Sequence, residues 1–223
     1  MQEVLWHLHN LDTLDVPVEK KEALACRVPF LEHVFKMNDP RSLSSFPSPR
    51  LLKTHLSYKY WEDNLAPVKK QVKVILWVAE PKDTIANYYN FWTTKGTFFD
   101  FPQIEWNYFF DLFKRDKLFE GNWYKTNTSW LKAYENEPNM LLLSYELSRK
   151  EPDDCVRKLA NFLGISLTEE KIRKLVNVIE FDKWPDWSNL FNGEQKTFTD
   201  QLTRTMVAGT PLENIYPCDE GIL

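Results

Sequence analysis

A lysine and a histidine two residues apart, Lys53 and His55, have the clearest chemical potential in this sequence. They lie at the end of the segment 50–55, whose apolar pair Leu51-Leu52 is typical of a short buried strand. An imidazole that titrates near neutral pH can take a proton from a hydroxyl or an amine. A neighbouring ammonium can stabilise an anion. The alternative that neither side chain has a chemical role stays open, because an isolated Lys-x-His is more often an ordinary histidine beside a solvated lysine.

Three apolar segments that alternate with helical patterns must position these side chains. Strands are predicted over 50–54, 72–79 and 140–146. Strands that alternate with helices indicate an α/β fold with three layers, in which a central parallel sheet is flanked by helices. Ligands of such sheets bind beyond the carboxyl ends of the strands, where Lys53 and His55 would lie. No linker interrupts the chain, so residues 1–223 are predicted to form one domain.

Helical signals fill the intervals between the strands. The first predicted helix, at the start of the chain, has Val4, Leu5 and Leu8 on one face. Further helices are predicted over 58–65, 83–91 with Asp83 as N-cap, 104–117, 122–136, 152–163 ended by Gly164, and 168–178. After residue 181 the regular pattern fades, and only 203–207 is expected to be helical.

Composition excludes several classes of protein. A formal charge of -4 and a pI of about 5.7 argue against a nucleic-acid-binding protein with a broad basic face. No apolar run approaches the ~18 residues of a membrane span. The three cysteines are far apart and lack metal-site spacing, so no metal is expected and a reducing, cytoplasmic location is favoured.

Several motifs, in the same order along the chain, are similar to those of the cytosolic sulfotransferase family. The resemblance covers about residues 1–184 and implies a P-loop-like sulfotransferase fold. The motifs are Arg-Val-Pro-Phe-Leu-Glu at 27–32, Ser-Pro-Arg-Leu-Leu-Lys-Thr-His-Leu at 48–56, Val-Ile-Leu-Trp-Val-Ala at 74–79 with Pro-Lys-Asp at 81–83, Leu-Ser-Tyr-Glu at 143–146, and Leu-Ala-Asn-Phe-Leu-Gly at 159–164.

The resemblance implies a reaction and roles for named residues. In that family, a histidine deprotonates an acceptor, which then attacks the sulfuryl group of 3′-phosphoadenylyl sulfate. His55 would be this base, and Lys53 would lie near the sulfuryl group. The residues implied to contact the nucleotide are Asn87, Tyr145, Phe181 and Trp184. Core packing is an equal alternative for the two aromatic residues Tyr145 and Phe181.

An aromatic loop falls where the family shapes its acceptor pocket. Phe98, Phe99 and Phe101, with Trp106 nearby, would suit a flat apolar acceptor such as a phenol or a steroid; other alcohols and amines are further acceptor classes. Core packing competes with this interpretation for each of these side chains.

The chain also departs from the family pattern. It begins with residues that resemble those following the family's phosphate loop, so the first strand and that loop are expected to be missing from a truncated, divergent member. Glu80 stands near the place of an arginine that binds the 3′-phosphate, and Asn87 replaces a serine. The basic C-terminal segment is not recognisable, and the dimer motif that begins near it is not intact, which leaves a homodimer as an open alternative.

Two functions from different classes follow. The first is a sulfotransferase that modifies a small hydroxyl or amine, with part of its donor site absent from the chain. The second is a catalytically inactive relative that binds small molecules or partner proteins. A P-loop kinase is disfavoured because the sequence contains no GxxxxGK[ST] motif.

Overall fold

The computed structural model describes residues 1–15, 23–32, 48–65, 71–95, 102–118, 123–178, 187 and 189–216. These residues form two compact units. The first unit consists of Met1–Leu56 and Leu147–Phe181, and the second of Ser57–Glu146 and Asp182–Leu223. The assignment of the whole chain to one domain therefore stays a prediction.

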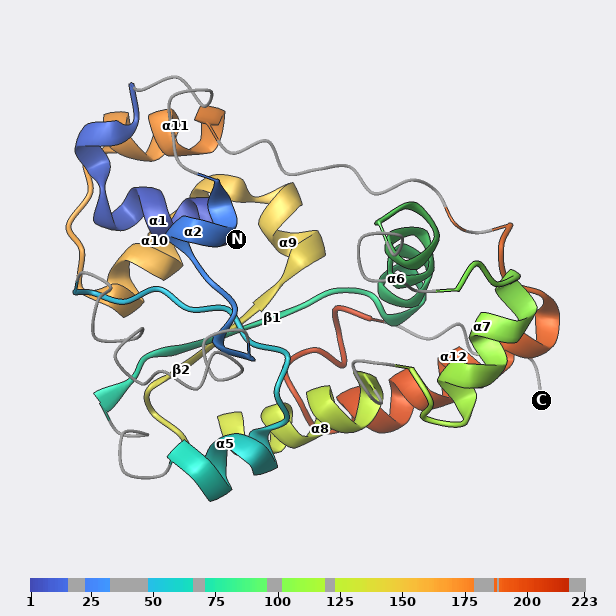
Figure 1. Cartoon of the computed structure of the whole chain (residues 1–223). Coiled ribbons are helices and arrows are strands. Elements are labelled where there is room, and N and C mark those ends of the chain that lie inside the picture. The colour runs from blue at the N-terminus through green and yellow to red at the C-terminus, as the bar shows by residue number, and fades with distance from the viewer. Residues whose placement is uncertain are drawn as a thin grey trace. The chain divides into compact units, whose positions relative to one another are not determined.

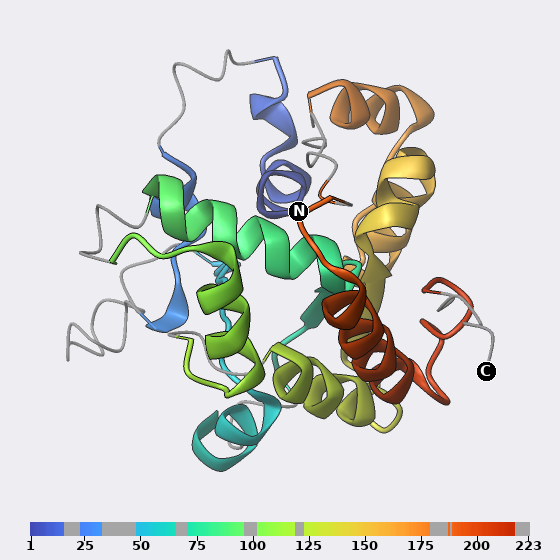
Figure 2. The same ribbon diagram turned by 90° about the vertical axis from the view of Figure 1, so that its right-hand side faces the viewer.

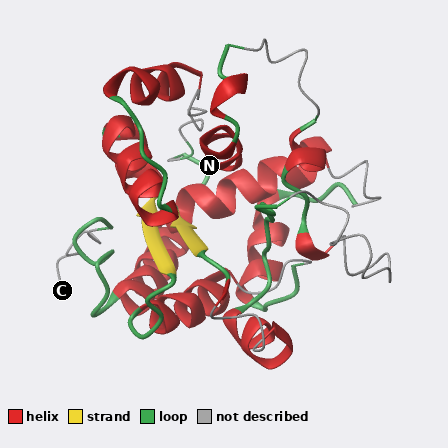
Figure 3. Cartoon of the chain, turned by 90° about the vertical axis from the view of Figure 1, so that its left-hand side faces the viewer, coloured by secondary structure: helices red, strands yellow, loops and turns green. Residues whose placement is uncertain are grey.

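A two-stranded parallel sheet lies in the second unit. Strands β1 (Val74–Val78) and β2 (Met140–Ser144) pair from Val74 with Met140 to Val78 with Ser144. Figure 3 shows the two strands in yellow, side by side. Their sequences are continuous apolar runs, which is typical of parallel strands covered on both faces. The sheet confirms the predicted α/β class, and its carboxyl edge is formed by Val78 and Ser144.

Helices in the second unit pack around an aromatic core, and α8 contacts β2. Helix α12 packs against α8 and α6, and Figure 2 shows α12 alongside α8. Phe109 of α7 is fully buried and contacts the rings of Tyr88, Trp92 and Trp106. The helices are α5 (Tyr58–Leu65), α6 (Pro81–Lys95), α7 (Trp106–Lys114), α8 (Trp123–Tyr134) and α12 (Gly193–Val207).

The described elements of the first unit are helical, and Figure 1 labels its α-helices. Helix α1 buries Val4 and Leu8 as predicted and packs against α2 and α10, which in turn packs against α11. Gly164 ends α10 with a φ of +79°, a left-handed conformation that glycine adopts without steric cost. The elements are α1 (Gln2–His9), the 3-10 turn η1 (Leu11–Thr13), α2 (Leu24–Arg27), α10 (Pro152–Leu163) and α11 (Glu169–Val178).

Three local predictions were wrong. The segment 50–54 is extended but is no strand, since within the described residues it forms a single parallel bridge, between Phe30 and Lys53. Strand β2 stops at Ser144 because Tyr145 begins helix α9 (Tyr145–Lys150), which passes from the second unit into the first. Asp83 lies inside α6 rather than at its N-cap.

The C-terminal helix is longer than the sequence suggested. Helix α12 begins at Gly193, because Asn192 and Gln195 form a reciprocal capping box at its first turn. The Asn192 side chain accepts from the Gln195 backbone N–H, and the Gln195 side chain accepts from the Asn192 N–H. No helix in the described ranges is long and apolar enough to cross a membrane.

Candidate active site

Lys53 and His55 lie in an extended segment of the first unit that is fastened to residues 29–31. The Lys53 N–H donates to the Pro29 carbonyl at 3.0 Å, and the Leu31 N–H donates to the Lys53 carbonyl at 2.8 Å. Although these two hydrogen bonds form only a single bridge, they hold the backbone of Lys53 in place. Alternate residues of an extended chain point to the same side, so Lys53 and His55 share a face.

The ring of Phe30 contacts both of these side chains. The His55 imidazole stacks on Phe30 with a centroid separation of 5.5 Å and an interplanar angle of 30°. The Lys53 Nζ atom lies 4.4 Å from the centroid of the same ring, within the range of a cation–π contact. The imidazole remains exposed while Lys53 is partly buried. Phe30 therefore holds a candidate base and a cation together, a role that the sequence had not suggested.

Glu32 anchors the backbone of His55. Its Oε1 atom accepts from the His55 N–H at 2.5 Å and from the Thr54 hydroxyl at 3.1 Å. The other oxygen, Oε2, is buried and has no hydrogen-bond partner in the described part of the chain. A charged acceptor strengthens such hydrogen bonds, so the carboxylate sets the position of His55. Nothing in the local sequence indicated Glu32, because it reaches His55, 23 residues away, only through the bridge between Phe30 and Lys53.

A second cluster of polar groups lies at the carboxyl edge of the β1–β2 sheet in the second unit. Glu146 Oε1 accepts from the Glu80 N–H at 2.8 Å. Glu146 Oε2 lies 2.9 Å from the Ser144 hydroxyl and 2.8 Å from the Tyr216 hydroxyl. The Tyr216 hydroxyl is also 2.9 Å from the Val78 carbonyl. Neither Glu146 nor Tyr216 was predicted as a site residue, because the two residues meet only through the fold.

Glu80, the departure noted in the sequence, belongs to this cluster. Its Oε2 atom accepts from the Asp83 N–H at 2.8 Å, so the carboxyl group caps the first turn of α6. Burial raises its pKa to about 7, although the Asp83 hydrogen bond opposes this shift. Lys82, the nearby cation, forms an ion pair of 2.7 Å with Asp200 of α12.

The other predicted site residues are placed only in part. Tyr145 is buried in the second unit and contacts the Trp77 ring edge-to-face at 5.5 Å. The Asn87 side chain donates to the Asp83 carbonyl at 2.8 Å, within α6. The roles assigned to both residues stay predictions. The remaining predicted residues lie outside the described part of the chain: Phe98, Phe99, Phe101, Phe181 and Trp184.

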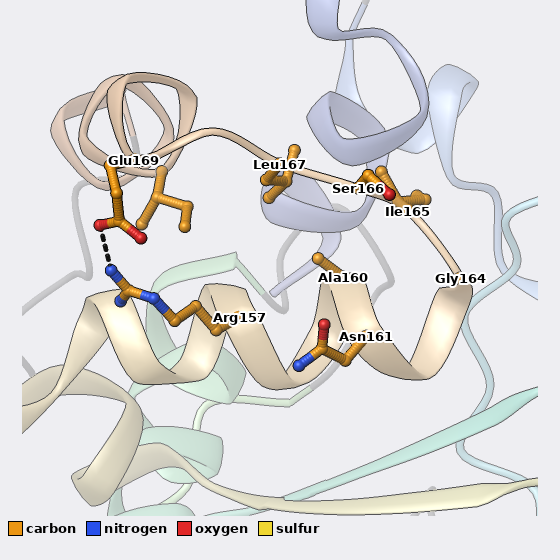
Figure 4. A pocket seen from close by; sticks show the side chains of 9 residues that line it. Arg157, Ala160, Asn161, Gly164, Ile165, Ser166, Leu167 and Glu169 are labelled. Atoms are coloured by element: carbon orange, nitrogen blue, oxygen red, sulfur yellow. Dashed lines mark hydrogen bonds and ion pairs between the residues drawn. The ribbon is translucent and has the colours of Figure 1, made fainter.

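A groove of about 500 Å³ lies in the first unit, between α10 and the connection to α11. Figure 4 shows the Arg157 side chain reaching from α10 to Glu169, with which it forms an ion pair. The lining residues include none of the predicted site residues. Among the described residues, no group of three or more His, Cys, Asp or Glu side chains is placed to hold a metal ion.

Comparison with known proteins decides the family. Residues 1–210 match the family described as the sulfotransferase domain. The chain belongs to the sulfotransferase family. Its relatives in this family include rat sulfotransferase 1A1, with 34% identity over 70% of the chain and 53% of the relative, and mouse sulfotransferase 6B1, with 26% identity over 93% of the chain and 73% of the relative. The chain thus spans about half the length of the first of these sulfotransferases and about three quarters of the second.

Solved structures support the sulfotransferase fold. Retinol dehydratase in complex with androsterone and the inactive cofactor PAP superposes with a TM-score of 0.72 at 18% identity, over 97% of this chain and 78% of that one. At 18% identity, this similarity is evidence for the fold alone. The predicted sulfotransferase fold and family are therefore confirmed.

Proposed function

We propose that this sulfotransferase-family protein transfers a sulfuryl group from 3′-phosphoadenylyl sulfate to a hydroxyl or amine of a small acceptor, in the cytoplasm and without a metal. The observation that carries the proposal is the pairing of Lys53 and His55 on the ring of Phe30. A base and a cation held together, with the base exposed, suit the transfer of an anionic group to a nucleophile.

The residues of the first unit have separable tasks in this proposal. His55 accepts the proton of the acceptor hydroxyl or amine, since its imidazole is exposed and its backbone is held by Glu32. Lys53 stabilises negative charge that develops beside it. Phe30 and Glu32 are positioning residues, because they contact the reacting side chains and their backbone rather than the substrate.

The proposed acceptor is a flat apolar alcohol, phenol, steroid or amine. Its support is the aromatic sequence Phe98, Phe99 and Phe101, to which we assign the acceptor pocket, and the presence of androsterone in the retinol dehydratase structure. For the nucleotide of the donor, Tyr145, Phe181, Trp184 and Asn87 are the proposed contacts. A homodimer is the proposed assembly.

The 3′-phosphate of the donor fits poorly with the described residues of the turn after β1. The turn after β1 presents the carboxyl group of Glu80, and Lys82 is already paired with Asp200. The Asn87 amide donates one of its two N–H groups to the Asp83 carbonyl. A carboxylate ~4 Å from a phosphate charge would oppose binding by about 4 kcal/mol at an effective dielectric constant of ~20. Glu80 is therefore the residue of this turn that most opposes a 3′-phosphate.

This misfit favours a second candidate function, that of an inactive sulfotransferase relative which binds the acceptor without modifying it. The two candidates share the acceptor and differ in the donor. A measurement of sulfuryl transfer therefore distinguishes the two candidate functions, whereas a measurement of acceptor binding does not.

The test is transfer of radiolabelled sulfate from 3′-phosphoadenylyl sulfate to a panel of phenols, steroids, alcohols and amines. We expect labelled product from at least one flat apolar acceptor, in proportion to protein concentration. The acceptor affinities are measured by calorimetry on the same samples. Acceptor binding without any labelled product would reject the transferase and support the binding protein.

A further inference from the structure

Helix α1 is a firm support within the first unit. Its residues Val4 and Leu8 are 0% and 2% exposed, and the helix packs against α2 and α10. From its first turn, the Gln2 side chain donates to the Val28 carbonyl at 3.2 Å. The start of α1 therefore contacts the chain just after α2, at the beginning of the segment that leads to the candidate site.

A bidentate ion pair joins the same turn of α1 to the end of α2. The Arg27 Nη1 atom donates to Glu3 Oε2 at 2.8 Å, and Nη2 donates to Oε1 at 2.5 Å. The Arg27 side chain is 5% exposed, and its guanidinium carbon lies 4.4 Å from the centroid of the Trp6 ring. Two parallel hydrogen bonds and a cation–π contact leave a planar guanidinium little freedom. Arg27 is thereby fixed against α1.

The segment 27–32 links this ion pair to the candidate base and cation. The Pro29 carbonyl accepts from the Lys53 N–H at 3.0 Å, and the next side chain, Phe30, stacks on the His55 imidazole. The proline ring fixes one of the two backbone dihedrals between these contacts. A displacement at the start of the segment is therefore passed on to the Phe30 ring rather than absorbed on the way.

We propose that Glu3 and Arg27 are positioning residues for the candidate base. Their ion pair holds segment 27–32 against α1 and thereby sets the place of the Phe30 ring on which His55 stacks. The effect on the reaction rate rests on the proposed sulfuryl transfer, whereas the effect on the position of His55 does not.

The first measurement is the chemical shift of the His55 ring protons near pH 8, because protons stacked on an aromatic ring are shifted upfield by its ring current. His55→Ala identifies the resonance, and Phe30→Leu gives the shift of the unstacked imidazole. We expect Glu3→Gln and Arg27→Lys to move the resonance at least about halfway toward that shift, since neither variant can form the bidentate ion pair.

The second measurement is the single-turnover rate of sulfuryl transfer. Glu3→Gln and Arg27→Lys are each expected to lower it about tenfold with acceptor affinity retained, because a base that is out of place reacts slowly. The double variant should lose no more than either single variant, since both substitutions remove the same interaction. Arg157→Gln, which breaks the ion pair with Glu169 in the same unit, is the matched control and should change neither the rate nor the His55 shift.

The two measurements separate the positioning role from the proposed function. Folded Glu3→Gln and Arg27→Lys with the wild-type His55 shift, or with the wild-type transfer rate, would overturn the positioning role. No transfer by wild type, together with the expected shifts, would reject the proposed function and support the positioning role. If Glu3→Gln does not fold, Arg27→Lys decides, because it keeps the positive charge beside Glu3.

Discussion

Replacing Glu80 by glutamine is expected to stabilise the folded protein at pH 8 by about 3 kcal/mol and to leave its stability near pH 4 almost unchanged. The cause is the buried carboxyl group, whose folded pKa of about 7 lies above the unfolded value of 4.5. Because the folded pKa is raised, stability is greatest below the unfolded pKa and is lost as the pH rises from about 4.5 to about 7. A shift of this size corresponds to about 3 kcal/mol.

Glutamine removes the ionisation but keeps an oxygen that can accept from the Asp83 N–H. Urea unfolding of wild type and Glu80→Gln at a series of pH values measures the difference directly. Glu194→Gln is the matched control, since Glu194 is exposed in the first turn of α12. Curves for wild type and Glu80→Gln that run parallel from pH 4 to pH 8 would contradict the assignment of the burial cost to Glu80.

Replacing Glu32 by alanine is expected to lower the rate of sulfuryl transfer about 100-fold with little change in acceptor affinity. The alanine removes the acceptor of the His55 N–H and of the Thr54 hydroxyl. The backbone that positions the His55 imidazole is then no longer held in place. A misplacement of a reacting group by ~1 Å can cost a factor of this order. The measurement is kcat and KM of the transfer reaction, with the expected loss confined to kcat.

The conservative substitution Glu32→Gln retains an acceptor oxygen and should recover most of the rate. The amide proton resonance of His55 gives a second measure, since loss of a 2.5 Å hydrogen bond to a carboxylate shifts it upfield. Glu151→Ala, at an exposed glutamate of the same unit, controls for general loss of charge. If Glu32→Ala and Glu32→Gln lose the same rate, Glu32 does not act through this hydrogen bond.

Local signals in the sequence predicted much of the fold. The apolar runs of β1 and β2, and the Pro152 start and Gly164 end of α10, depend on neighbouring residues and were found where expected. The segment 50–54 was predicted wrongly as a strand because its apolar run is short, and it pairs through a single bridge between Phe30 and Lys53. The Asn192–Gln195 capping box was present in the sequence, but threonine-rich α12 has little apolar periodicity.

The site could be predicted only where residues are adjacent in the sequence. Lys53 and His55 were found because one short segment contains both. Glu146 and Tyr216 are 70 residues apart, and nothing in either neighbourhood indicates that their side chains meet. The sequence did indicate that Glu80 is unusual, but its burial and raised pKa depend on packing around the end of β1.

The central claim of the proposed mechanism is that His55 is the base for sulfuryl transfer. It is tested most directly by the single-turnover rate of transfer from labelled 3′-phosphoadenylyl sulfate to the best acceptor, in wild type and in His55→Ala. We expect a loss of at least about 100-fold in His55→Ala, with acceptor affinity retained, and a wild-type rate in the control His9→Ala. Transfer by His55→Ala at the wild-type rate would show that His55 is not the base.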